Sequence, residues 1–191
     1  MSLHVLRPEK DHEPAAFVIP HRSPAMFFAG PILGANNWQE NGVQNAKIIA
    51  AEAKQTIHVA NPRWTTIAPD KRLAKNEQRN WEKEHIRHIA LMRKFGAVVF
   101  WIAAQDKNAD PPNPPGRAYG QGTRAEFSHV TGMKFMDDDI QIVLGIDPNH
   151  DGHGLHEYRH TAREFGLPVH DSLPAAIKSG AELILRAAAN A

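Results

Sequence analysis

Cysteine is missing from the chain, so neither a disulfide nor a cysteine-bound metal can hold its fold together. Neither is needed, because a chain of 191 residues can bury roughly 70% of the surface that its unfolded form exposes. An excess of charge is missing too, since 22 Lys and Arg stand against 21 Asp and Glu, for a formal net charge of +1. Because the basic residues are spread along the whole chain, we expect neither nucleic acid nor a membrane as a partner.

Long apolar runs are also lacking, since none approaches the roughly 20 residues that span a bilayer. The start of the chain is polar, with four charged side chains among residues 9–13, which is unlike a targeting segment. We therefore expect a soluble, cytoplasmic protein. Residues 1–24 contain several prolines and one short apolar patch at 15–19, which predicts an extended N-terminal arm before a single domain over residues 25–191.

From residue 25 onward, short apolar runs alternate with segments of helical periodicity. The runs expected to be strands are Ala25–Ala29, Thr56–Ala60, Gly96–Ala103, Ile140–Ile146 and Leu167–His170. Helices are expected after Asn36 or Asn37 as the N-cap, over 76–94, 123–136 and 155–165, and from Leu173 to the end. Five repeats of strand and helix predict an α/β fold with a doubly wound, five-stranded parallel sheet covered by helices on both faces.

Ligands of such sheets bind outside the carboxyl ends of the strands, where the strand order reverses. Four loops are expected there, over residues 30–37, 61–70, 105–122 and 147–154. The third is unusual because it holds four prolines and three glycines and is longer than an ordinary connection. Long loops of this kind are often functional.

The segment Gly120-Gln-Gly-Thr-Arg-Ala-Glu126 is expected where this long loop meets a helix. Glycines allow close approach of a ligand, the free amides at a helix start attract anions, and Glu126 would lie near the same pocket. The alternative is a capping box, in which Thr123 caps the helix and Glu126 completes the cap. The segment also fits G-x-G-x-x-A, but it follows the third expected strand and not the first, so we expect no nicotinamide cofactor.

Two further segments carry acid or imidazole groups at helical spacing. Glu82 and His85 share one face of the expected second helix, beside Trp81, which suggests an acid or substrate-holding role. The alternative is that Trp81 packs, Glu82 is solvated or paired with Lys83 or Arg79, and His85 is an ordinary surface histidine.

Residues 156–160 fit H-E-x-x-H, in which two histidines one turn apart bind zinc. Polar residues stand where zinc-protease helices are apolar, and no third ligand has an obvious position, so we expect no metal. The alternative to a metal site is a solvated, histidine-rich surface.

Several motifs in chain order resemble the nucleoside 2-deoxyribosyltransferase-like family. They are Phe27-Phe-Ala-Gly-Pro-Ile32, Trp38, Asn61-Pro-Arg63, Trp81-Glu82, the strand 98–102 and Gly122-Thr-Arg-Ala-Glu126. The resemblance implies a flavodoxin-like sheet, homo-oligomers without a cofactor, and cleavage of an N-glycosidic bond by a glutamate nucleophile. Glu126 occupies the nucleophile's position.

The resemblance also implies the rest of the site. The substrate-binding residues would be Gly30, Pro31, Trp38, Asn61, Arg63, Gly122, Thr123 and Arg124. Glu82 stands where the family has an aspartate that holds the sugar. The family's second aspartate, which works with the leaving base, is Gly120 here, so Asp106 and Asp110 are the nearest acids and Asp106 is the third catalytic candidate.

These expectations leave three functions open. The first is transfer or hydrolysis of a (deoxy)nucleoside, because the two reactions differ only in the acceptor. The second is hydrolysis of a nucleoside 5′-monophosphate, since Arg63 and Arg124 are candidates to face a phosphate and Gly-x-Gly-Thr-x-x-Glu is similar to the phosphate loop of lysine-decarboxylase-like cytokinin-riboside phosphate hydrolases. The third is a catalytically silent nucleotide-binding module on the same fold. For a homo-oligomer, the alanine-rich last helix, 175–189, offers a packing face.

Overall fold

The computed structural model describes residues 2–8, 19, 20, 22–63 and 71–190. A parallel sheet of six strands runs through this part of the chain, in the order β1-β3-β2-β4-β5-β6. The strands are β1 (Leu3–Leu6), β2 (Ala25–Ala29), β3 (Ile57–Ala60), β4 (Gly96–Ile102), β5 (Gln141–Ile146) and β6 (Val169–His170). The prediction of a doubly wound α/β fold with a parallel sheet is confirmed.

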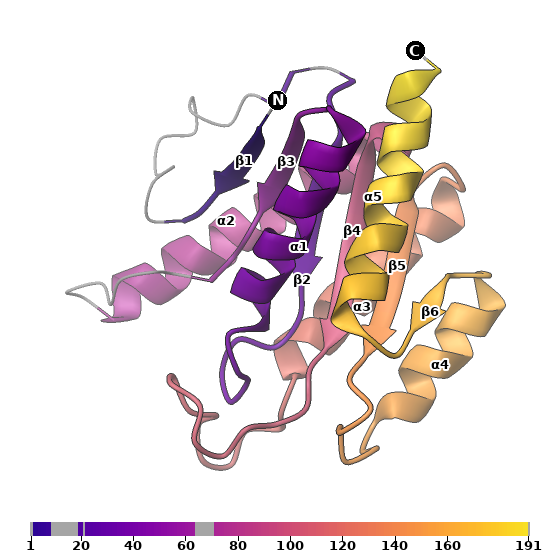
Figure 1. Ribbon diagram of the computed structural model, residues 1–191. Helices are drawn as coiled ribbons and strands as arrows, with labels where there is room; N and C mark the ends of the chain where they lie inside the picture. The colour runs from indigo at the N-terminus through magenta and orange to yellow at the C-terminus, as the bar shows by residue number, and fades with distance from the viewer. Residues whose placement is uncertain (1, 9–18, 21, 64–70, 191) are drawn as a thin grey trace.

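Helices cover both faces of the sheet (Figure 1). They are α1 (Trp38–Ala53), α2 (Lys71–Leu91), α3 (Gln121–Met136), α4 (Leu155–Glu164) and α5 (Leu173–Ala189), with a 3₁₀ turn η2 over Arg93–Phe95. One core lies between the sheet and α1 and α5, and a second core lies between the sheet and α2, α3 and α4. This division follows from strand geometry, because successive side chains of a strand point to opposite faces. In β2, Phe27 belongs to the second core and Phe28 to the first.

The strand count is the one correction to the expected fold. Five strands were predicted, but residues 3–6 of the expected arm form β1 and pair in parallel with β3, from Leu3 opposite Ile57 to Leu6 opposite Ala60. This pairing gives hydrogen-bond partners to the backbone N–H and C=O groups on the outer edge of β3. Without β1, these groups would be left to water. Four residues at the start of a chain carry too little periodicity to be distinguished from extended coil. The apolar patch at 15–18 lies outside the described residues.

Without β1, the strand order is the flavodoxin-like 2-1-3-4-5. The order reverses between β2 and β4, because the chain goes from β2 outward to β3 and then returns to β4 on the other side of β2. The carboxyl ends of β2 and β4 therefore border the crevice where ligands of this fold class bind. Within the described residues, no helix is long and apolar enough to cross a membrane.

Candidate active site

The loops that follow β2 and β4 meet at the carboxyl edge of the sheet, at the lower side of Figure 1. Gly34, with a φ of 72°, donates its backbone N–H to the carbonyl of Pro111 at 2.9 Å and accepts from the Asp106 N–H at 2.8 Å. The long loop is tied to itself by Asn113, whose amide donates to the Arg117 carbonyl at 2.8 Å. The proline-rich segment that the sequence marks as functional is therefore fixed against the β2–α1 loop. Of the loop expected over 61–70, residues 64–70 lie outside the described part.

Two glutamates from different helices lie close enough to interact electrostatically beside this edge. Burial and the neighbouring carboxylate of Glu126 raise the pKa of Glu82 to about 8, although a hydrogen bond from Gln78 and the charge of Arg79 oppose the rise. Burial likewise raises the pKa of Glu126 to about 7. The structure thus brings together two of the three catalytic candidates, Glu82 of α2 and Glu126 of α3.

Both carboxyls resist ionisation. Burial disfavours the charged form of each, and the charge of Glu126 adds to the rise in the pKa of Glu82. Because the two groups interact, their pKa values belong to the pair as a whole, and the pair titrates near neutral pH.

Gln78 sets the position of the Glu82 carboxylate. Its side-chain amide donates to Glu82 Oε1 at 2.9 Å and to the Pro62 carbonyl at 3.1 Å. One carboxamide therefore connects the glutamate to the loop at the end of β3. The motifs did not suggest Gln78, although its place one turn before Glu82 on the same face of α2 was the available signal.

The rest of the α2 motif is buried. The His85 ring stacks on the Trp81 indole with centroids 3.7 Å apart, and its Nδ1 lies 2.8 Å from the Trp81 carbonyl oxygen. Burial lowers the pKa of His85 to about 4, so the ring is neutral at pH 7. His85 is therefore not the surface histidine of the alternative interpretation, and it packs under the site beside Trp81.

Tyr158 is a site residue that the motifs did not suggest. It comes from α4, is 5% exposed, and packs its ring on Phe127 with centroids 5.0 Å apart. Burial raises its pKa, while Arg124, which is hydrogen-bonded to it, opposes the rise and the charge of Glu126 adds to it. A hydroxyl that stays protonated thus lies within reach of the charges of Glu126 and Arg124. The signal was the buried spacing of Leu155, Tyr158 and Ala162.

The capping-box interpretation of Glu126 is wrong. The N-cap of α3 is Gly120, in the left-handed conformation with a φ of 65° and no side-chain cap bond. Thr123 lies inside the helix and is 3% exposed, so it does not cap the helix start. Glu126 consequently belongs to the second turn, where its carboxylate has no capping role. Gly122 is exposed beside Arg117 in the first turn.

The first glycine-proline motif shapes the backbone of the site. A Cβ atom on Gly30 would overlap the Trp101 carbonyl and lie 2.6 Å from the Trp38 ring, so only glycine fits. The Trp38 indole is 1% exposed and donates to the Pro31 carbonyl at 2.9 Å. Trp38 therefore supports the loop from inside the core. Pro31 comes close to the start of α3, since its ring lies 3.8 Å from where a Cβ of Gly120 would be.

Arg63 connects three loops. Its guanidinium donates to the carbonyls of Asn36 at 3.1 Å and Asp110 at 2.9 Å, and to Gln39 Oε1 at 3.4 Å. Its backbone N–H donates to Asn61 Oδ1 at 3.0 Å. Arg63 is 8% exposed. The sequence made it a candidate for binding a phosphate, but in the structure its guanidinium donates to acceptors of the protein itself.

Asp106 lies apart from the glutamate pair. Its Oδ1 accepts from the Asn108 N–H at 2.8 Å, and its charge acts on Tyr119 together with Asp147. The Tyr119 hydroxyl donates to the carbonyls of Ala103 at 3.0 Å and Ala104 at 3.2 Å. Asp106 thus belongs to a polar cluster between the long loop and the β5–α4 loop. Neither glutamate is perturbed by it.

The two histidines of H-E-x-x-H lie on the exposed side of α4. The rings of His156 and His160 have centroids 6.1 Å apart, and both side chains are exposed, while Tyr158 between them faces inward. Nowhere in the described part of the chain do three or more His, Asp or Glu side chains gather as metal ligands.

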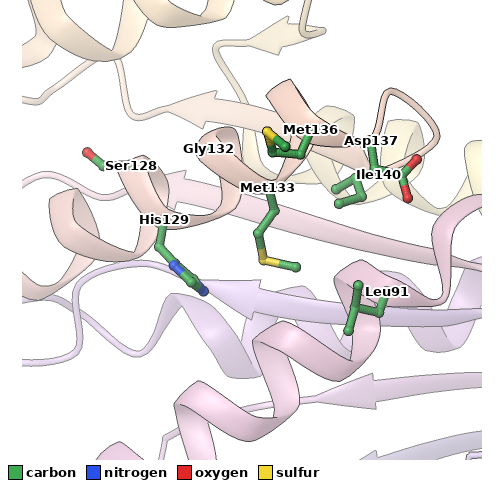
Figure 2. Close-up of a pocket in the computed structure, with 8 residues that line it drawn as sticks. All are labelled: Leu91, Ser128, His129, Gly132, Met133, Met136, Asp137 and Ile140. Carbon is green, nitrogen blue, oxygen red and sulfur yellow. The ribbon is translucent and has the colours of Figure 1, made fainter.

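An open apolar groove of about 470 Å³ lies between α2 and α3 (Figure 2). Leu91 comes from the end of α2, and Met133 and Met136 come from α3, with His129 and Asp137 among the other lining residues. The titratable lining residues of the groove are one imidazole, His129, and one carboxylate, Asp137. Leu91 is 51% exposed, Met136 is 82% exposed and the adjacent Phe135 is 76% exposed.

Comparison with known proteins found no family model that matches the chain and no curated protein similar to it.

Proposed function

We propose that the protein cleaves the N-glycosidic bond of a nucleoside, with Glu126 as nucleophile and Glu82 as general acid. The carrying observation is the pair of partly buried, interacting carboxyls whose pKa values are raised toward neutral pH, beside the carboxyl edge of an open α/β sheet. Two acids with separated proton affinities are what glycoside cleavage requires. The resemblance of the motifs to nucleoside 2-deoxyribosyltransferases supports the same chemistry.

In the first step, a carboxylate oxygen of Glu126 attacks C1′ of the sugar. The C1′–N bond breaks with its electron pair going to the base, and the carboxylic acid of Glu82 delivers a proton to the departing base nitrogen. Positive charge that develops on the sugar ring is stabilised by the Glu126 carboxylate. The products are a sugar ester on Glu126, a free base and an ionised Glu82.

In the second step, Glu82 acts as general base. It takes a proton from the acceptor, which attacks C1′ while the ester bond to Glu126 breaks and returns its electrons to the carboxylate. Two displacements at one carbon retain its configuration. If the acceptor is water the protein is a hydrolase, and if it is a second base the protein is a transferase.

A nucleoside is favoured over its 5′-monophosphate by the two candidate arginines. Arg63 donates to three acceptors of the protein itself, and Arg124 is hydrogen-bonded to Tyr158. A phosphate would have to displace these bonds. Hydrolysis of a 5′-monophosphate is therefore the second candidate.

The first experiment is a product analysis. The protein is incubated with deoxynucleosides, ribonucleosides and their monophosphates, with and without a free acceptor base, and the products are separated by chromatography. Free base without an acceptor indicates hydrolysis, and a new nucleoside indicates transfer. Absence of turnover on all of these, combined with measurable binding, would identify a catalytically silent module and contradict the proposal.

The second experiment tests the nucleophile. Glu126→Gln keeps the shape of the side chain but removes the carboxylate, so we expect turnover to fall on the order of 10³-fold or more. A 2-fluoro-2-deoxy analogue should trap the ester on Glu126, detected by peptide mass spectrometry. Glu157→Gln, on the exposed side of α4, is the matched control and should keep full activity. A fully active, folded Glu126→Gln variant would show that the nucleophile is assigned to the wrong residue.

Association into a homo-oligomer and a cytoplasmic location belong to the same proposal. The face of α5 suggested for association instead packs on α1, β4 and β5, with Ala176, Ile177 and Ile184 buried there. Leu91, Phe135 and Met136 at the α2–α3 groove are large apolar side chains left exposed. Light scattering of the intact protein measures whether a second copy covers such a surface.

A further inference from the structure

The side-chain amide of Gln78 uses both of its hydrogens. Nε2 donates to the Pro62 carbonyl at 3.1 Å and to Glu82 Oε1 at 2.9 Å. Exchanging the two ends of the carboxamide would place the Gln78 oxygen against the Pro62 carbonyl, which can only accept a hydrogen bond. Pro62 therefore fixes the orientation of Gln78, and an N–H group points at Glu82 whether that carboxyl is neutral or charged.

The two oxygens of Glu82 have different surroundings. Oε1 accepts the hydrogen bond from Gln78, whereas Oε2 accepts none from the residues that the structure describes. Oε2 is not one of the buried polar atoms that lack a partner, although Glu82 itself is partly buried. This oxygen therefore keeps accessible surface, and a ligand can reach it.

The hydrogen bond from Gln78 decides which oxygen of a protonated Glu82 carries the proton. A carboxylic acid carries its proton on one oxygen and accepts hydrogen bonds at the other. Because the N–H of Gln78 requires an acceptor at Oε1, the proton belongs on Oε2. Once Glu82 is ionised, the same hydrogen bond becomes charge-assisted and roughly twice as strong. Gln78 therefore also stabilises the carboxylate that remains after the proton has left.

We propose that Gln78 is a positioning residue that keeps the acidic proton of Glu82 on Oε2, from which the leaving base takes it. This rests on the proposed glycosidase function. As the C1′–N bond breaks, its electron pair goes to the base, the Oε2 proton moves to the base nitrogen, and the electron pair of the O–H bond stays on Glu82. In the second step the same oxygen takes the proton of the acceptor. Gln78 acts through Glu82 alone and contacts neither sugar nor base.

The groups around Glu82 predict how its titration depends on Gln78. Among the described residues, the charged groups that act on it are Glu126 of α3 and Arg79 of α2, while Pro62 contributes a carbonyl without charge. Glu126 raises the pKa of Glu82, and Arg79 and the hydrogen bond from Gln78 lower it. Loss of that hydrogen bond, with both charges left in place, should therefore raise the pKa of Glu82 further.

Gln78→Met tests the proposal, because methionine keeps the length of the side chain and removes both N–H donors. We expect kcat to fall on the order of 10-fold with KM nearly unchanged, since the acid is less well placed while the substrate keeps its contacts. The loss should shrink for substrates with a more acidic leaving base, which needs less help from a proton. The alkaline limb of the kcat/KM profile, where the pair loses its last proton, should move to higher pH.

Gln44→Met is the matched control. Gln44 donates to Glu40 Oε1 at 3.3 Å on the exposed side of α1, so this variant loses a hydrogen bond between Gln and Glu one helical turn apart, away from the site. It should keep the turnover and the pH profile of the wild type. Gln78→Glu keeps the shape of the side chain and adds a third carboxyl beside Glu82, so its alkaline limb should move further than that of Gln78→Met.

The position of the alkaline limb does not depend on how much of the protein is folded, so partial unfolding of a variant cannot imitate the expected shift. An alkaline limb that stays in place in Gln78→Met would overturn the role of Gln78, and so would equal losses for all leaving bases. The two proposals fail in different ways. If the wild-type protein releases no base from any substrate, the glycosidase proposal falls and takes the role of Gln78 with it. An active wild type with an unchanged profile in Gln78→Met overturns the role of Gln78 alone.

Discussion

Glu82 and Glu126 hold their protons to a higher pH in the folded protein than in an unfolded chain. The cause is burial for both, with the charge of Glu126 added for Glu82. Such a pair is poised for acid-base chemistry near neutral pH and costs stability there, because the folded state opposes ionisation that the unfolded chain allows.

The pair makes stability depend on pH in a specific direction. The ordinary value of both carboxyls is 4.5, and the folded values are about 7 and about 8. Between these limits the folded state binds more protons than the unfolded state, so the contribution of the pair is most favourable below pH 4.5 and falls as pH rises to 8.

Glu126→Gln should therefore be more stable than the wild type at pH 8, on the order of 2 kcal/mol, and nearly equal to it at pH 5. Thermal or urea unfolding at both pH values measures the difference. Glu157→Gln again serves as the control and should follow the wild type at both. If the Glu126→Gln gain is the same at pH 5 and pH 8, it reflects packing and not ionisation.

Single residues also show what the sequence could and could not predict. Glu82 and Glu126 could be chosen as candidates because each stands in a motif that resembles the family's, Trp81-Glu82 and Gly122-Thr-Arg-Ala-Glu126. Gln78 and Tyr158 were missed because their roles depend on which helix faces which, and local spacing does not contain that information. The same limit explains Asp106, which was chosen as the nearest acid along the chain but lies with Tyr119.

At the scale of elements, some expected boundaries agree closely with the observed ones. β2 and α5 begin as predicted, whereas α2 begins at Lys71, not at 76, and α3 at Gln121, not at 123. The N-cap of α3 is Gly120, which makes no side-chain cap bond, so the sequence marks this helix start only weakly. Most of the sheet could be predicted because continuous apolar runs have few other solutions in a domain of this size.

Two helices contain glycines whose surroundings differ. Gly132 of α3 is exposed, and a Cβ atom there would meet nothing within 4 Å. Gly180 of α5 is buried, and a Cβ atom there would lie 2.6 Å from Val99 Cγ2. Only the second glycine is required by packing.

Gly132→Ala should therefore raise the free energy of unfolding by about 0.5–1 kcal/mol, because alanine restricts the unfolded chain and favours the helix. Gly180→Ala should lower it by about 1–3 kcal/mol, because the added methyl group overpacks the core. Denaturant titration of the two variants measures both changes. An equal effect of the two substitutions would mean that helix propensity, and not space, decides the outcome at these positions.

At the scale of the whole molecule, the N-terminal strand extends the sheet and supports the site. The Leu6 carbonyl accepts from the Asn61 N–H at 3.0 Å, at the end of β3. Arg7 pairs with Glu40 of α1 at 2.7 Å and also reaches the Arg63 carbonyl. A segment expected to be an extended arm thus holds the end of β3 in place.

Deleting residues 2–7 should lower the free energy of unfolding by on the order of 3 kcal/mol, since several backbone hydrogen bonds and an ion pair are lost together. Turnover should fall as well, because Asn61 loses its backbone support. Calorimetry and the base-release assay measure the two effects. Arg7→Ala alone should show a smaller loss, and an unchanged melting temperature after the deletion would show that β1 contributes nothing.

The bonds of Arg63 determine how the site meets its ligand. One guanidinium fastens the loops after β2 and β4 to the end of β3, so three walls of the crevice are joined before any substrate arrives. Ordering those loops is already part of folding, and a ligand need not supply the entropy for it. We therefore expect the rate of ligand association to be limited by diffusion and orientation, and not by a closing movement of these loops.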